Sequence, residues 1–177
     1  CKVDSAVVSQ YYTGRIDAIY ESVQNGNFNS FNTWNQNPPS LSTNGNTINV
    51  KDTVTGGYLD FKNNTEINVK SPGSLELDGL EFKNNTTLNV ESGASLIIKE
   101  NLIGFNNLNS TINGVLIIGG DTDFKNNATI TNNSDSIYIC GTSDPNIVSN
   151  IKTCSDLKND LPEIWKKVIG TSLRSEE

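Results

Sequence analysis

Five carboxylates are the residues of this chain best suited to chemistry. They are Glu66, Glu76, Asp78, Glu81 and Glu91. Two carboxylates about 5 to 9.5 Å apart can hydrolyse a glycosidic bond, and neighbouring repeats could bring Glu66 beside Glu76 or Glu91. The chain has no histidine, and no arginine lies near these acids, so nothing would tune the pKa of a catalytic base. We therefore expect no catalytic residue, and polysaccharide cleavage stays an alternative.

No metal or cofactor site is expected. Without histidine or a Cys-x-x-Cys pair, the chain lacks the ligand spacing of a zinc site. The segment Gly119-Gly120-Asp121-Thr122-Asp123 is a single acidic turn, whereas calcium-binding rolls repeat such turns. We interpret this segment as a corner of the fold.

The three cysteines are Cys1, Cys140 and Cys154. Cys140 and Cys154 flank a short loop, and in an extracellular chain this arrangement predicts a disulfide; two buried thiols are the alternative. Cys1 is a lipidation candidate, because a mature bacterial lipoprotein begins at the cysteine that carries its lipid. A cysteine introduced for expression is the alternative at this position.

These residues must be positioned by a repeat of 19 to 23 residues. Four copies share one phrase: Phe61-Lys62-Asn63-Asn64, Phe82-Lys83-Asn84-Asn85, Phe105-Asn106-Asn107 and Phe124-Lys125-Asn126-Asn127. Short units that repeat in this way stack on one another. The phenylalanines are expected to point inward, and the Asn pairs to form corners, because Asn tolerates the left-handed backbone conformation.

Each copy also contains a run in which apolar and polar residues alternate, as in a half-buried strand. The apolar column is predicted to point inward: Ile48, Ile67, Leu88, Ile112 and Ile130. A repeat of this length with three strands predicts an all-β fold, a short right-handed parallel β-helix of about five coils of about 20 residues.

The predicted organisation is a tether (1–18), an N-terminal cap (19–45), the parallel β-helix (46–143) and a C-terminal cap or junction (144–177). Open solenoid ends expose an apolar cross-section and unpaired strand edges, so caps are physically required. Phe28, Phe31 and Trp34 are expected to form the first cap, and Trp165 to cover the last coil.

Outward Thr and Asn residues are the predicted binding face. The candidates are Thr47, Asn49, Asn68, Thr87, Asn89, Thr111, Asn113, Thr129 and Thr131. Their two columns would lie about 7 Å apart and repeat about every 4.8 Å along the coil. Ice-binding β-solenoids present such lattices, so ice binding is a further alternative, although Glu66 interrupts the Thr column.

The charge balance excludes some partners. A net charge of −7 with no basic cluster argues against nucleic acid and anionic membrane surfaces. No apolar run approaches the roughly 20 residues that cross a bilayer. Membrane attachment is therefore expected only through a lipid on Cys1.

The opening of the chain contains the segments 22–28, Asn32-Thr33-Trp34, Pro39 and 45–50, and the coils contain 112–116 and 137–141. These segments resemble β-helix modules of secreted and cell-surface proteins of Bacteroidota. Asn159-Asp160-Leu161-Pro162 is similar to the junction that precedes a type IX secretion sorting domain. The resemblance implies a parallel β-helix displayed outside the cell, without implying one activity.

Together these features predict a non-catalytic structural or binding module on the outer face of the bacterial outer membrane, or secreted. Its expected partner is an outer-membrane or surface protein, or a glycan, within a surface assembly or adhesin. Carbohydrate binding or degradation and ice binding are the alternatives.

Overall fold

The computed structural model describes residues 18–145 and 150–172. These residues form a parallel β-solenoid of about four turns, with about 21 residues per turn, and a short helical C-terminal cap. The strands are β1 (Ile19–Glu21), β2 (Gly26–Asn27), β3 (Thr47–Val50), β4 (Thr53–Phe61), β5 (Glu66–Val69), β6 (Ser74–Val90), β7 (Ser95–Ile98), β8 (Leu102–Ile112), β9 (Val115–Ile118), β10 (Thr122–Asn126), β11 (Thr129–Asn132), β12 (Ile137–Ile139) and β13 (Ile151–Lys152). The helices are η1 (Phe31–Thr33), α1 (Cys154–Asp160) and α2 (Pro162–Ser172). The predicted fold class is confirmed.

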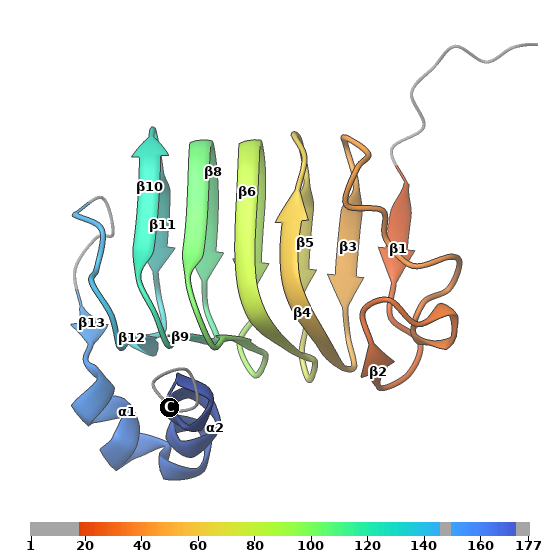
Figure 1. The fold of residues 1–177 in the computed structure, drawn as a ribbon. Coiled ribbons are helices and arrows are strands. Elements are labelled where there is room, and N and C mark those ends of the chain that lie inside the picture. Colours follow the sequence, from red (N-terminus) through yellow and green to blue (C-terminus); the bar gives the residue numbers. More distant parts are fainter. Residues whose placement is uncertain (1–17, 146–149, 173–177) are drawn as a thin grey trace, which may run out of the picture.

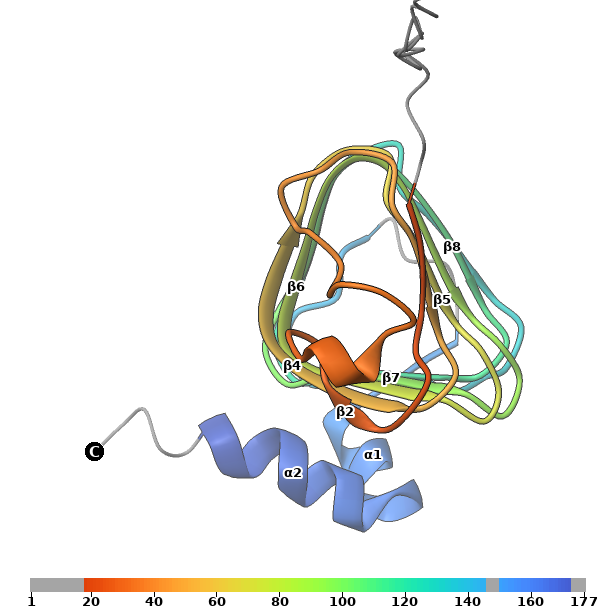
Figure 2. The same ribbon diagram turned by 90° about the vertical axis from the view of Figure 1, so that its right-hand side faces the viewer.

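The coil has a triangular cross-section (Figure 2). Seen from its N-terminal end, the chain runs clockwise as the turns recede, so the solenoid is right-handed. Long strands such as β6 bend around corners and contribute to all three sides, which explains their length of up to 17 residues. Figure 1 shows the turns stacked side by side from β1 to β10.

Each side of the triangle is a stack of parallel strands. The Thr/Asn face is the outer surface of β1, β3, β5, the ends of β6 and β8, and β11. The helix-covered face consists of the starts of β4 and β6 with β7, β9 and β12. The charged face consists of the end of β4, the middle of β6, the start of β8 and β10.

The interior is mainly apolar, with a few buried hydroxyl side chains such as Ser110, and the five predicted inward aliphatic residues are all buried. Aromatic rings continue from the first cap into the coils, with Phe28 and Phe61 centroids 6.0 Å apart and Phe61 and Phe82 centroids 6.1 Å apart. These contacts join the cap and the first coils in one core.

The prediction that Phe105 points inward is wrong. Gly104 occupies the inward position between Phe82 and Phe124, while Phe105 faces outward, with Lys83 Nζ 4.5 Å from its ring centroid. A Cβ atom at Gly104 would lie 2.9 Å from Phe124, because Phe124 and Leu108 fill this part of the core. Glycine therefore makes room for rings from the next coil.

The N-terminal cap closes the first coil and its strand edge. Trp34 Nε1 donates a hydrogen bond to the Phe28 carbonyl at 2.7 Å, and both rings are buried. Asn35 pairs with Glu21 through its backbone N–H and its side-chain oxygen, and Gln36 Nε2 donates to the Ile19 carbonyl. These bonds occupy the edge of β1, which would otherwise be free to pair with another chain.

The prediction that Phe31 packs in this cap is wrong, because its side chain is 70% exposed. It lies in η1, a single turn that brings Thr33 and Trp34 inward.

The C-terminal helices lie beside the coil, against the helix-covered face (Figures 1 and 2). Their apolar side chains form a second cluster with outward residues of three strands: Ile97, Ile117 and Tyr138 with Leu157, Leu161, Ile164, Trp165, Val168 and Ile169. The helical cap is confirmed. Trp165, however, packs against the helix-covered face and does not cover the open apolar end of the last coil. Among residues 18–145 and 150–172, no helix is long and apolar enough to cross a membrane.

Replacing Phe28 with alanine should lower the free energy of unfolding by about 3 to 5 kcal/mol, the usual cost of removing a fully buried aromatic ring. Phe31→Ala is the matched control, because it removes the same ring from an exposed site. Urea denaturation of the two variants compares them directly. Equal losses would contradict the assignment of Phe28 to the cap core.

Candidate functional site

The Thr/Asn face presents most of the predicted binding residues on one surface. Within β3, β5, the end of β6 and β11, the candidates alternate with buried residues and therefore point outward. Asn49 pairs with Asn68, and Asn68 pairs with Asn89. The structure thus brings together Thr47, Asn49, Asn68, Thr87, Asn89, Thr111, Thr129 and Thr131.

The register of β8 differs from the prediction by two residues. Leu88 pairs with Ser110, not with Ile112, and Ile112 pairs with Val90. The first outward column is therefore Thr47, Glu66, Thr87, Asn109 and Thr129, and the second is Asn49, Asn68, Asn89, Thr111 and Thr131. Asn113 lies beyond the end of β8, where its side chain accepts a hydrogen bond from Asn133.

Alternation alone could not fix this register. Leu108, Ser110 and Ile112 are all buried, and a shift of two residues keeps every side chain on the same side of the strand. The corner fixes it, because Asn84 stacks on Asn106. Ser110, the inward residue opposite Leu88, is satisfied by donating from its hydroxyl to the Leu88 carbonyl at 2.8 Å.

The side chains of this face are hydrogen-bonded to one another. Asn68 Nδ2 donates to Asn49 Oδ1 at 3.2 Å, and Asn89 Nδ2 donates to Asn68 Oδ1 at 2.9 Å. Glu66 accepts from Asn68 at 2.9 Å and from the Thr47 hydroxyl at 3.5 Å. The face is therefore an ordered polar surface with two carboxylates, Glu21 and Glu66, near its N-terminal end.

A groove that the sequence analysis did not single out runs along the corner between the charged face and the Thr/Asn face. It has a volume of about 650 Å³ and is lined by Asn63, Asn64, Asn84, Asn85, Asn106, Asn107, Asn126 and Asn127. We call it the asparagine groove. The repeated Asn pairs were the available signal, but a sequence cannot show whether stacked corner side chains enclose a hollow.

The predicted left-handed corners are confirmed. The second Asn of each pair has a positive φ, from 49° at Asn127 to 57° at Asn64. Each column is a ladder of amides in which one coil donates to the preceding coil, with N···O distances of 2.5 to 3.2 Å.

The five carboxylates are spread around the coil. Glu66 lies on the Thr/Asn face, Glu76 on the helix-covered face and Glu81 on the charged face. Asp78 pairs with Lys99, and Glu91 accepts from the Ser71 backbone N–H at a corner. Neither predicted carboxylate pair is formed. Glu76 lies on a different side of the triangle from Glu66. Glu66 pairs with Thr87, four residues before Glu91, which corresponds to about 13 Å along the strand.

The charged face holds a compact network around Glu81. Tyr58 donates to Glu81 Oε2 at 2.6 Å, Lys83 pairs with Glu81, and Lys83 Nζ lies 3.4 Å from Asp60 Oδ1. The hydrogen bond to Glu81 raises the pKa of Tyr58 to about 12. Hydrogen bonds from Lys83 and then Tyr58 lower the pKa of Glu81, and the bond to Glu81 raises that of Lys83.

This network keeps each group in its ordinary charge state at neutral pH. Tyr58 stays protonated, Glu81 stays ionised and Lys83 stays cationic, so none of the three is prepared to exchange a proton near neutral pH.

The acidic turn at 119–123 forms a corner, as predicted. Asp121 Oδ1 accepts from the Thr142 backbone N–H at 2.6 Å, and Asp123 pairs with Lys125. No group of three or more Cys, Asp or Glu residues suited to a metal ion occurs within 18–145 and 150–172.

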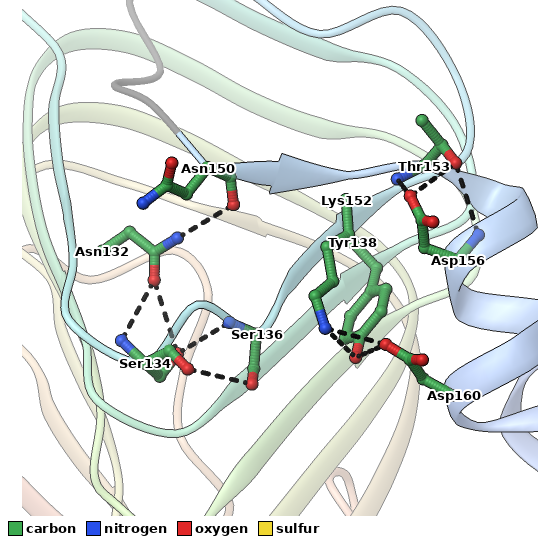
Figure 3. Close-up of polar contacts among 9 residues, drawn as sticks. All are labelled: Asn132, Ser134, Ser136, Tyr138, Asn150, Lys152, Thr153, Asp156 and Asp160. Carbon is green, nitrogen blue, oxygen red and sulfur yellow. Dashed lines mark hydrogen bonds and ion pairs between the residues drawn. The ribbon is translucent and has the colours of Figure 1, made fainter.

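The predicted disulfide between Cys140 and Cys154 is confirmed, with the Cα atoms 4.3 Å apart. It joins the chain just after β12 to the start of α1. Beside it, Lys152 donates to Asp160 at 2.7 Å and Tyr138 donates to Asp160 at 2.9 Å (Figure 3). The bond from Lys152, followed by that from Tyr138, lowers the pKa of Asp160.

The first turn of α1 is also held locally. Thr153 and Asp156 form a capping box, in which the Thr153 hydroxyl accepts from the Asp156 N–H and Asp156 accepts from the Thr153 N–H. Figure 3 shows this box next to the Lys152 contacts. Cys1, the lipidation candidate, lies outside the described residues.

These features define the class of the protein as a right-handed parallel β-solenoid whose helical side cap is joined to its last coil by a disulfide. No protein-family model, no curated protein and no solved structure matches the chain.

Removing the disulfide by Cys140→Ser/Cys154→Ser should lower the free energy of unfolding by about 3 kcal/mol, because the bond closes a loop of about 15 residues. Wild-type protein treated with a reductant is the comparison and should lose a similar amount, whereas the double variant should not respond to the reductant at this bond. Urea denaturation measures the effect, and hydrogen exchange should rise first in α1. A double variant as stable as the oxidised wild type would contradict a structural role for the bond.

The pKa of Tyr58 should fall from about 12 toward 10.0 in the Glu81→Gln variant, because its main cause is the hydrogen bond to that carboxylate. A raised native pKa means that the stabilising contribution is present below pH 10.0 and is lost as the pH rises through about 12. Tyrosinate absorbance, referenced to Tyr58→Phe, measures the titration, and Glu66→Gln is the control. Titration of wild-type Tyr58 near 10.0 would contradict the assignment.

Proposed function

We propose that the protein is a non-catalytic binding module that acts outside the cell and contacts a partner protein through its Thr/Asn face. The observation that carries this proposal is the in-register array of outward Thr and Asn side chains over β3, β5, β6, β8 and β11. Main-chain hydrogen bonds between successive coils fix the backbone that carries these side chains before a partner binds. Such preorganisation lowers the entropic cost of association.

The proposed location rests on the disulfide and on the sequence resemblance. Disulfides persist in oxidising environments such as the periplasm and the cell surface. Similarity to β-helix modules of Bacteroidota surface proteins favours the outer face of the outer membrane, or secretion, and a place in a surface assembly or adhesin. A lipid on Cys1 would supply the attachment.

The geometry favours this function over the alternatives. Glu66 and Glu76 lie on different sides of the coil, which does not favour glycoside hydrolysis. An ice-binding lattice would repeat a Thr-x-Thr pair from strand to strand. Here β11 carries such a pair, Thr129 and Thr131, but the outward pair is Thr87 and Asn89 on β6 and Asn109 and Thr111 on β8. The pair therefore does not repeat across the face. Glu66 adds a hydrated charge to the same surface.

The test is a mild-detergent purification of the native protein from membranes, with identification of the proteins that accompany it. Thr129→Arg/Thr131→Arg places two bulky cations on the Thr/Asn face and should abolish copurification. Thr53→Arg/Thr55→Arg is the matched control, because these exposed threonines lie on β4, outside that face.

Intact mass of the native chain reports the lipid on Cys1 in the same experiment. Copurification that survives the β11 variant, or that the β4 variant removes equally, would overturn the choice of face. A solitary, unmodified chain in the medium would overturn the surface-assembly proposal.

A further inference from the structure

The asparagine groove is a second surface, separate from the Thr/Asn face. It follows the corner where β4 and β10 end and where β6 and β8 bend from the charged face to the Thr/Asn face. From Asn63 to Asn126 it extends about 14 Å at the spacing of stacked strands. Its walls are eight primary amides, and none of them carries a charge.

The amides are held in fixed positions. Asn64, Asn85, Asn107 and Asn127 share one backbone conformation, with φ of 49° to 57°. Each member of the two columns after the first donates to the Asn of the preceding coil. A ligand would therefore meet side chains that lose little conformational freedom on binding.

Each amide has more hydrogen-bonding groups than its ladder uses. A primary amide has two N–H donors and two acceptor lone pairs. In the ladder, an inner residue such as Asn85 or Asn107 donates once and accepts once. One donor and one acceptor of each inner amide thus remain outside the ladder, and they recur about every 4.8 Å along the groove.

Hydroxyl groups match this pattern, because a hydroxyl both donates and accepts. A chain of hydroxylated units fits a repeating amide array better than a single small molecule does. Charge argues against an anionic chain, because the protein carries −7. Of the lysines beside the groove, Lys83 and Lys125 are paired with Glu81 and Asp123. Lys62, at the first coil of the groove, acts on Glu81 through its charge.

We propose that the asparagine groove binds a neutral polysaccharide chain lying along the solenoid axis. The proposal concerns a different surface from the partner-binding proposal above and does not depend on it. Binding there requires no catalytic group, and the repeating amides set the direction of the bound chain.

Affinity electrophoresis tests this with three neutral soluble polysaccharides, hydroxyethylcellulose, galactomannan and a soluble β-1,3-glucan, and with alginate as the anionic probe. We expect retardation by at least one neutral polymer and none by alginate. Retardation by no neutral polymer, or equal retardation by alginate, would overturn the proposal.

Asn85→Asp/Asn107→Asp is the groove variant. Asp keeps the size of Asn and tolerates the left-handed conformation, but it loses the amide donors. Affinity should fall about tenfold or more. Asn68→Asp/Asn89→Asp, an identical change on the Thr/Asn face, should bind within about twofold of wild type on the same scale.

Asn85→Gly/Asn107→Gly provides a second groove variant that is free of added charge, since glycine accepts a positive φ without strain. Circular dichroism confirms that each variant is folded. Groove variants that are folded and bind as wild type would overturn the proposal, and so would an equal loss in the Thr/Asn-face variant. The β11 arginine variant used for the partner should retain polysaccharide binding, so the two proposals can fail separately.

Discussion

The in-register stacking of one coil on the next is the constraint on which this structure depends. Each strand of a coil obtains its main-chain hydrogen bonds from the coils before and after it, since three parallel sheets share one interior. Any residue type that recurs in the repeat is therefore multiplied into a column. The aromatic stack, the Asn ladders and the Thr/Asn face are three results of this one rule.

Each column consists of one repeat position stacked over successive coils. The three sides therefore differ where a coil departs from the residue type of its column. On the helix-covered face, Thr55 and Glu76 are followed in register by Ile97, Ile117 and Tyr138. In this column the apolar residues are those that α1 and α2 cover, so the change from polar to apolar along it marks the docking site of the cap. On the charged face, acids and lysines are at least partly exposed and pair with one another. The coil of β8 interrupts this pattern with Ile103 and Phe105.

Much of the fold could be predicted from the sequence because the same local pattern occurs in several copies of the repeat. The strand period, the buried Ile and Leu column, the left-handed Asn corners and the Cys140 to Cys154 bond all follow from local patterns. The register of β8 did not, since a two-residue shift preserves the alternation that made the strand recognisable. The inward prediction for Phe105 was wrong because Gly104 takes the inward position there. The space that a side chain at Gly104 would need is filled by Phe124 from the next coil. The asparagine groove was missed because a hollow depends on how side chains stack in space.

The amide ladders also have a direction. In each of them the N–H group points toward the preceding coil and the carbonyl toward the following one, as in Asn89 to Asn68, Asn84 to Asn63 and Asn85 to Asn64. Aligned side-chain dipoles add, as peptide dipoles do in a helix. Turning over one inner amide would set N–H against N–H and carbonyl against carbonyl, so all members of a column must share one orientation. The solenoid is therefore electrically polar along its axis, with its positive pole at the coil nearest β1 and its negative pole at the coil of β10 and β11.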